Sequence, residues 1–182
     1  QQCLDTPYAG TERLLSWYCF KYGVLGFEFW GVNWYTYDPW KFGWHSFIQQ
    51  SNSEEEASYW VRYPDGDGYV AYPGKAIGRE EPVSSIRFAA VRDGEEDYEY
   101  LILLRQRIEA ARQAGRSVTA AEAVLNRALN LVSIPNPGGL RTSEFINDPA
   151  EPLAIRDAIA EQIEALKSPS PPTPLPILGE GS

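Results

Sequence analysis

A short and nearly continuous apolar run, residues 24–30, follows directly on an amphipathic stretch near the start of the chain. From about Thr11 to Tyr22, apolar side chains recur every three to four positions, which predicts a helix with one buried face. Gly23 then suits the left-handed position that ends many helices. A run as apolar as residues 24–30 is typical of a strand covered on both faces, as in parallel sheets. The sequence therefore predicts a helix-then-strand step of an α/β fold.

The composition fits one ordinary globular domain and argues against two classes of partner. Of the 182 residues, 43% are hydrophobic and 23% are charged, which are common proportions for a globular domain. The 25 acidic and 16 basic residues give a net charge of −9, and an acidic surface repels the phosphates of nucleic acids. No apolar run approaches the ~20 residues that cross a bilayer. We therefore expect neither nucleic acid nor a membrane as a partner.

The start of the chain and its cysteines bear on how the protein is made. The sequence begins at Gln1 and contains no methionine, so we expect a processed chain or a piece of a longer one. Cys3 and Cys19 are the only cysteines, and two thiols do not make a disulfide framework. Neither their pairing nor the redox compartment follows from the spacing.

Aromatic residues concentrate in the front part of the chain. All six tryptophans fall in the first third, at Trp17, Trp30, Trp34, Trp40, Trp44 and Trp60. From Gly31 to about Pro82 the pattern predicts one long loop, and loops of this length are usually functional or disordered. The many Trp and Tyr side chains argue against disorder. Within the loop, residues 59–63 and 69–72 flank an Asp-Gly turn, which predicts a β-hairpin.

The back part of the chain is predicted to be helical. Ser84 or Ser85 is placed to cap one helix, and Gly94 is predicted to break it because its neighbours have the pattern of a capping box. Thr119 and Glu122 form another capping box ahead of a further helix. A last helix begins near residues 149–153, with an apolar stripe at Ile155, Ile159, Ile163 and Leu166.

The C-terminal segment differs in composition from the rest. Residues 168–182 begin with a Pro-rich stretch that cannot bury itself. We expect this tail to be disordered and residues 1–167 to form one domain.

Three residues stand where the predicted strand gives way to its loop. In barrels and doubly wound folds, ligands bind at the C-terminal ends of the strands. Trp30 and Trp34 offer flat indoles that can cover the apolar face of a sugar ring, and the Asn33 amide can both donate to and accept from hydroxyls. Judged by spacing alone, burial of both indoles in a core beneath the long loop is the favoured interpretation.

Other polar residues of the front part have simpler explanations. Asp38 precedes a proline and is typical of the start of a turn. His45 is the only histidine, so a metal site built from several histidines is excluded, and no Ser or Cys partner is marked for it. Residues 65–68, Asp-Gly-Asp-Gly, lack the other ligands of a calcium loop. A hairpin turn is favoured there, with Asp67 at its tip and able to face a pocket.

The acidic run at residues 93–99 and the single Glu28 are further candidates for catalytic carboxylates. Residues 93–99 contain five acids, and a solvated helix N-terminus, which the helix dipole favours, is a better explanation than the paired carboxyls of a glycosidase. Glu28 lies within the apolar run, where a carboxylate is costly unless it is paired or functional. Pairing with an arginine such as Arg13 or Arg87 is favoured over a position in a polar barrel interior.

A series of short motifs in a fixed order resembles one known family. The series is Glu12-Arg13-Leu14-Leu15-x-Trp17, Lys21-Tyr22-Gly23, Gly26-Phe27-x-Phe29-Trp30-Gly31-Val32-Asn33, Asp38-Pro39-Trp40, Gly66-Asp67-Gly68-Tyr69-x-x-Tyr72-Pro73-Gly74, Pro82-Val83-x-Ser85-Ile86-Arg87 and Arg92-Asp93-Gly94-x-Glu96-Asp97-Tyr98-Glu99-Tyr100-Leu101. It resembles the C-terminal part of the catalytic domain of glycoside hydrolase family 123 and its uncharacterised relatives. The resemblance covers roughly residues 5–104.

The resemblance implies the C-terminal portion of a (β/α)8 TIM-type barrel that is helix-rich and incomplete on its own. The family includes β-N-acetylgalactosaminidases in which the acetamido oxygen of the sugar attacks the anomeric carbon, an aspartate orients the amide and the adjacent glutamate is the general acid. In this chain no Asp is directly followed by Glu. We therefore expect that pair, with the remainder of the barrel, upstream of residue 1, and we expect this chain alone to be inactive.

The resulting site hypothesis is a pocket wall without catalytic groups. It assigns substrate binding to six residues: Trp30, Asn33, Trp34, Asp67, Tyr72 and Arg87. It includes no catalytic residue, metal ligand or cofactor, and its partner is a carbohydrate of the N-acetylhexosamine type. Secretion or a periplasmic location would suit such a hydrolase. Two alternatives remain open: a non-catalytic carbohydrate-binding protein, and a helical interaction module whose aromatic side chains form a buried core.

Overall fold

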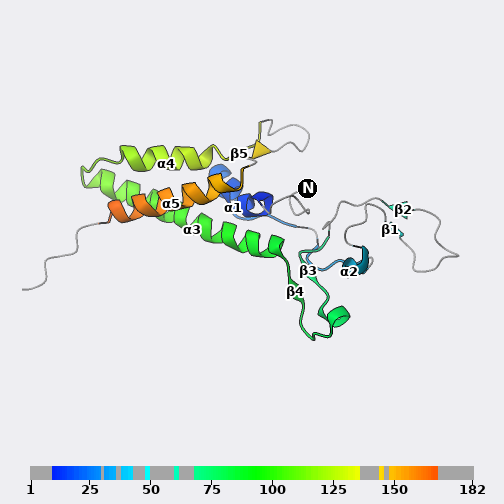
Figure 1. Cartoon of the computed structure of the whole chain (residues 1–182). Helices are drawn as coiled ribbons and strands as arrows, with labels where there is room; N and C mark the ends of the chain where they lie inside the picture. The colour runs from blue at the N-terminus through cyan, green and yellow to red at the C-terminus, as the bar shows by residue number, and fades with distance from the viewer. Residues whose placement is uncertain are drawn as a thin grey trace, which may run out of the picture.

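Four helices packed side by side form the main body of the molecule (Figure 1). The computed structural model describes residues 10–29, 31–35, 38–42, 48–49, 60–61, 68–135, 144–145 and 148–167. The helices are α1 (Gly10–Tyr22), α3 (Ile86–Gln113), α4 (Thr119–Leu129) and α5 (Ala150–Ala165). Helix α3 is the central element, because α1, α4 and α5 all pack against it.

Short antiparallel strand pairs complete the described fold. The pairs are β1 (Ile48–Gln49) with β2 (Trp60–Val61), β3 (Ala71–Tyr72) with β4 (Val83–Ser84), and β5 (Val132–Ser133) with β6 (Glu144–Phe145). A short helix, α2 (Pro39–Phe42), and a 3-10 turn, η1 (Gly74–Ile77), lie in the connections. The chain is thus helix-rich, with small sheets, and belongs to the α/β class.

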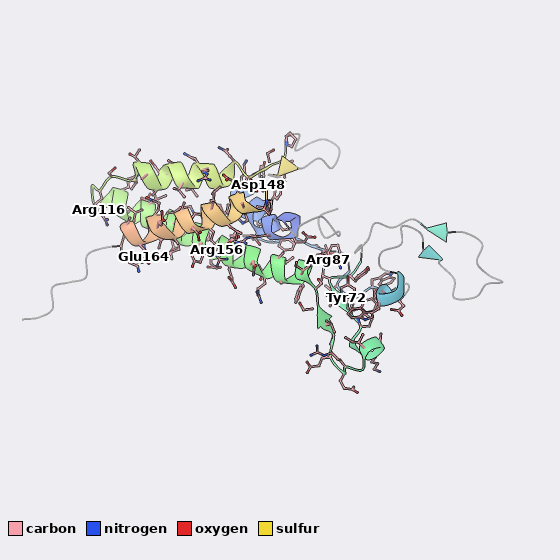
Figure 2. The ribbon with its side chains drawn as sticks, viewed as in Figure 1. Tyr72, Arg87, Arg116, Asp148, Arg156 and Glu164 are labelled. Carbon is pink, nitrogen blue, oxygen red and sulfur yellow. The ribbon has the colours of Figure 1, made fainter. Side chains whose placement is uncertain are left out.

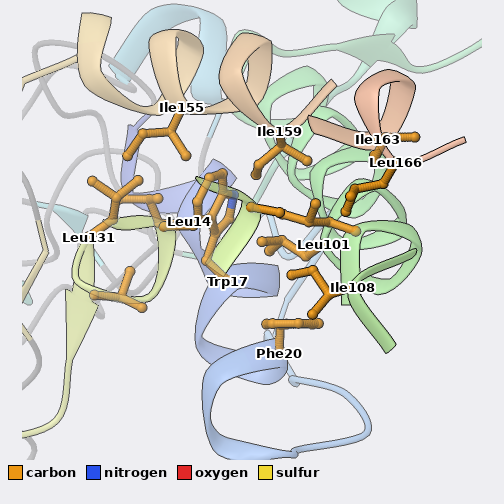
Figure 3. Packing of buried hydrophobic residues seen from close by; sticks show 14 of the residues in the cluster. Leu14, Trp17, Phe20, Leu101, Ile108, Leu131, Ile155, Ile159, Ile163 and Leu166 are labelled. Carbon is orange, nitrogen blue, oxygen red and sulfur yellow. The ribbon is translucent and has the colours of Figure 1, made fainter. Parts of the chain in front are cut away.

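The main hydrophobic core lies between the four helices (Figure 3). Leu14, Trp17 and Phe20 of α1 meet Leu101 and Ile108 of α3 there. The stripe predicted for the last helix is confirmed, since all four of its residues, Ile155, Ile159, Ile163 and Leu166, are buried in this cluster. Full burial of one such aliphatic side chain contributes roughly 1.5–3 kcal/mol, so the stripe holds α5 on the bundle.

Gly94 does not break the predicted helix. It lies within α3 (Ile86–Gln113), which continues through it. A β-carbon at Gly94 would overlap the backbone carbonyl of Arg13 in α1. Glycine is therefore present at this position because α1 and α3 approach each other there, and the predicted break was wrong.

The acidic run is not at a helix end, although Glu95, Glu96 and Glu99 are solvated as predicted. It lies inside α3, and Asp97 is only 1% exposed. Its carboxylate accepts hydrogen bonds from Arg13 Nε at 2.6 Å and Nη2 at 2.9 Å, and from Trp17 Nε1 at 3.2 Å. Arg156 Nη1 of α5 lies 3.3 Å from the same carboxylate. One buried charge therefore joins three helices.

The predicted helix starts were partly correct. Ser85 caps α3 as predicted, accepting a hydrogen bond from the Phe88 amide at 3.1 Å. Helix α4 starts at Thr119, but its N-cap residue is Val118 and no side chain caps it. The capping-box prediction was wrong, because the Glu122 carboxylate binds Arg112 instead.

The segment after α1 is not the predicted strand. Gly23 ends the helix with a φ of +66°, as expected, but residues 24–29 have no strand conformation and Leu25 is fully exposed. Among the described residues no neighbouring strand pairs with this segment, and a strand without a partner leaves its backbone groups unsatisfied. Glu28 is also exposed and lacks the expected ion pair within the described residues, since Arg13 binds Asp97.

The predicted hairpin was wrong as well. Trp60–Val61 pairs upstream with Ile48–Gln49, and Ala71–Tyr72 pairs downstream with Val83–Ser84. The turn at residues 65–67, the lone His45, Cys3 and the tail at residues 168–182 lie outside the described residues. Cys19 is a buried free thiol, and burial raises its pKa.

Candidate functional site

Two loop segments, residues 31–35 and 68–72, lie side by side near the N-terminal end of α3. The Trp34 amide donates to the Gly68 carbonyl at 2.8 Å, and the Val70 amide donates to the Val32 carbonyl at 2.9 Å. A β-carbon at Gly31 would lie 2.7 Å from the Gly68 carbonyl oxygen, so only glycine allows this approach. The long loop is thus pinned by backbone contacts where the predicted site begins.

A line of four aromatic rings runs from these segments to α2. We call Tyr35, Tyr69, Tyr72 and Trp40 the aromatic ladder. The ring centroids are 6.3 Å apart for Tyr35 and Tyr69, 5.4 Å for Tyr69 and Tyr72, and 4.8 Å for Tyr72 and Trp40. These separations lie within or near the range in which aromatic pairs attract each other.

Polar atoms of the ladder hold its rings against the backbone. The Tyr35 hydroxyl donates to the Ala71 carbonyl at 2.6 Å, and Trp40 Nε1 donates to the Pro73 carbonyl at 2.8 Å. Desolvation raises the pKa of the Tyr35 hydroxyl above its usual value. The outer rings therefore expose carbon faces, while their donors are already used.

Asp38 sets the position of α2. Its carboxylate accepts a hydrogen bond from the Trp40 amide at 2.9 Å, which confirms the turn role predicted for it.

Ser85, the cap of α3, also donates through its hydroxyl to the Val70 carbonyl at 2.5 Å. The site segments are thereby attached to the helical body.

Arg87 packs against Tyr69, a buried ring within the ladder. The residue is 2% exposed, and its guanidinium carbon lies 5.0 Å from the Tyr69 ring centroid. Figure 2 shows Arg87 at the start of α3 and Tyr72 beside α2. A guanidinium over a ring face is attractive, so Arg87 is placed to fix Tyr69, and through it the half-buried Tyr72.

Of the other predicted site residues, the structure describes Asn33 and Trp34, which lie in the segment 31–35. Asn33 and Trp34 are exposed, with Trp34 at 60%, and Asn33 forms an isolated β-bridge with Tyr69. Trp30 and Asp67 lie outside the described residues. The interpretation of Trp34 as core is therefore wrong, while its role in binding stays a prediction.

An apolar groove lies on another part of the same region. It has a volume of about 570 Å³ and is lined by the exposed segment after α1, by Val32 and Val70, and by α3 residues that include Phe88, Glu95 and Glu99. None of the ladder residues lines it. Within the described part of the chain, no group of three or more His, Cys, Asp and Glu side chains is arranged to hold a metal ion.

Sequence reasoning missed three members of the ladder: Tyr35, Tyr69 and Trp40. Tyr35 follows Trp34 directly, and Trp40 follows the Asp38 turn, so proximity to the strand end and the turn was the available signal. Tyr35 and Trp40 are held by backbone carbonyls more than 30 positions away in the sequence, which spacing does not reveal.

Comparison with known protein families gives the class of the protein. Residues 5–104, more than half of the chain, match the family described as Glycoside hydrolase 123, catalytic domain. The chain therefore belongs to this glycoside hydrolase family, as the order of its motifs predicted. The ladder and Arg87 lie within the matched region, whereas α4 and α5 lie beyond it.

One further comparison and one structural finding bear on the class of the protein. No curated protein matches the chain. None of the helices in the part of the chain that the structure describes combines the length and apolar character needed to span a membrane. Membership of a glycoside hydrolase family suggests a carbohydrate as the substrate.

Proposed function

We propose that this chain is part of a glycoside hydrolase acting on N-acetylhexosamine-type glycans, similar to β-N-acetylgalactosaminides. In this proposal it supplies the wall of the sugar pocket, and the acid/base pair lies elsewhere. The observation that carries the proposal is the exposed Trp34 and Asn33 beside an immobilised set of aromatic rings.

The chemistry of this surface suits a neutral sugar. An indole face covers the C–H face of a pyranose, and an exposed amide such as Asn33 can exchange hydrogen bonds with hydroxyls. Tyr72 continues the aromatic surface, and Arg87 acts from behind Tyr69. Trp30 and Asp67 complete the proposed wall by their positions in the sequence.

The catalytic groups are expected outside this chain. The family resemblance implies an aspartate that orients the acetamido group and, directly after it, a glutamate as general acid. No Asp in this sequence is directly followed by Glu. The sugar's own acetamido oxygen would attack the anomeric carbon, so the wall has to hold the ring still.

The proposal also includes the C-terminal portion of a TIM-type barrel. Its support is the apolar segment 24–29, which is exposed at residues 24–28 and lines an apolar groove. In a barrel, neighbouring strands would pair with the backbone of this segment, and the barrel interior and outer helices would cover its side chains. The remainder of the barrel is thus the proposed partner of this chain.

The test compares the full-length protein with residues 1–182 alone. We expect the full-length protein to hydrolyse a β-N-acetylgalactosaminide and residues 1–182 to be inactive. Trp34→Ala in the full-length protein should raise KM about threefold to tenfold, and Trp34→Phe should raise it less. Leu153→Ala, an exposed position on α5, is the control. An unchanged KM in Trp34→Ala would remove Trp34 from the wall.

A second candidate is a non-catalytic carbohydrate-binding protein. The observation that favours it is the missing Asp-Glu pair together with the exposed aromatic surface. Binding of N-acetylhexosamines by the full-length protein without hydrolysis would support this candidate over the enzyme.

A further inference from the structure

The outer end of the aromatic ladder carries an indole that no sequence pattern had assigned to the site. Trp40 is 40% exposed although it packs on Tyr72, with ring centroids 4.8 Å apart and an interplanar angle of 40°. Trp34, the exposed indole of the proposed wall, precedes Tyr35 at the opposite end of the ladder. The two indoles thus belong to different ends of one rigid row.

Three contacts immobilise Trp40, two through its indole and one through its backbone amide. Its Nε1 donates to the Pro73 carbonyl at 2.8 Å, its ring lies on Tyr72, and its backbone amide is held by the Asp38 carboxylate at 2.9 Å. An aromatic ring that is already fixed loses little conformational entropy when a ligand stacks on it. Because its only polar atom is used, the exposed part of the ring is a carbon surface.

The part of the ladder that leads to Trp40 is supported by buried residues. Arg87 and Tyr69 are buried, Tyr72 is half-buried, and Trp40 is the most exposed of these four side chains. The buried guanidinium lies over Tyr69, which meets Tyr72 edge to face at 78°. This order supports a rigid platform at the surface.

We propose that Trp40 is a stacking platform for a second sugar residue, the one linked to the N-acetylhexosamine held by the wall. This inference rests on the proposed function and adds a specificity-determining residue to it. Trp40 thereby favours disaccharides and longer glycans over glycosides whose leaving group is too small to reach it. The face of a pyranose ring that carries few hydroxyls can stack on the Trp40 indole, because the indole is neutral and its N–H group already has a hydrogen-bond partner.

The experiment measures two substrates with the full-length protein. One is the methyl β-glycoside of N-acetylgalactosamine, and the other is a disaccharide with the same sugar at its non-reducing end. Trp40→Ala should lower kcat/KM for the disaccharide roughly threefold to tenfold relative to the methyl glycoside. Trp40→Phe, which keeps a flat ring, should retain most of the preference, whereas Trp40→Leu should lose it.

Controls separate the possible failures. Leu153→Ala should leave the substrate ratio unchanged, and Trp34→Ala should weaken both substrates alike. If the Trp40 variants lost activity on both substrates equally, or on neither, the platform would be refuted. If the unmodified protein hydrolysed neither substrate, the proposed function would fail instead. Should Trp40→Ala not fold, the Phe and Leu variants still decide the question through the ratio.

Discussion

Arg13 binds the carboxylate of Asp97 with two hydrogen bonds, of 2.6 Å and 2.9 Å, across the contact between α1 and α3. The two residues are 84 positions apart, and Asp97 is almost fully buried. Bidentate pairs of this kind fix orientation as well as distance. The pair therefore sets how the helix that precedes the site segments lies on the helix that follows them.

Asp97→Asn should destabilise the protein strongly. The variant leaves the Arg13 guanidinium in a partly buried place without its anion, and loss of one partner of a buried pair costs about 3–5 kcal/mol. Because the amide keeps some hydrogen bonds, we expect the free energy of unfolding, measured in urea, to fall by about 3 kcal/mol. Asp93→Asn, an exposed neighbour on α3, is the control. Equal stability of the two variants would mean that Asp97 is not the link between the helices.

Gly94→Ala should also destabilise the protein, although alanine favours a helix over glycine by about 1 kcal/mol. The added methyl group would overlap the Arg13 carbonyl, which is helix backbone and cannot rotate away. Overpacking of this kind costs typically about 1–3 kcal/mol. After the helix gain of about 1 kcal/mol is subtracted, we expect a net loss of up to about 2 kcal/mol. Gly26→Ala, where the methyl group meets open space, should have little effect. A more stable Gly94→Ala would show that α1 and α3 are not in close contact.

Local features of the fold were predictable from the sequence. The end of α1 at Gly23, the Ser85 cap and the α5 stripe depend on spacing within a few residues, and all three are confirmed. The uninterrupted course of α3 at Gly94 depends instead on a helix 81 positions earlier in the chain. No local pattern carries that information.

The candidate site was predictable in the same partial way. Trp34 and Asn33 were located by their place after an apolar run, even though that run is not a strand in this structure. Tyr69 and Trp40 were missed because they join the site through contacts with Arg87 and Pro73. The run 24–29, exposed at residues 24–28, shows why the strand prediction failed. A sheet partner decides strand formation, and apolarity alone does not.

Tyr35 makes stability sensitive to alkaline pH. Desolvation raises the pKa of its hydroxyl in the folded protein above the value of 10.0 for a free tyrosine. The unfolded chain therefore ionises first as the pH rises, and the contribution of Tyr35, complete below pH 10, is lost through the folded pKa. We expect the free energy of unfolding to fall more steeply from pH 9 to 11 in the unmodified protein than in Tyr35→Phe. Parallel pH profiles would contradict this prediction.

Leu25→Glu tests whether the apolar segment after α1 is covered in the full-length protein. Leu25 is fully exposed in residues 1–182, so the substitution should leave the stability of that chain unchanged within about 0.5 kcal/mol. It should also reduce the self-association expected from an uncovered apolar edge, as measured by sedimentation velocity. If the remainder of the barrel covers the segment in the full-length protein, burial of the new carboxylate there should lower Tm by several degrees. Leu153→Glu, on the exposed side of α5, should leave Tm nearly unchanged in both proteins. Equal tolerance of Leu25→Glu in the two proteins would refute the proposed cover by the remainder of the barrel.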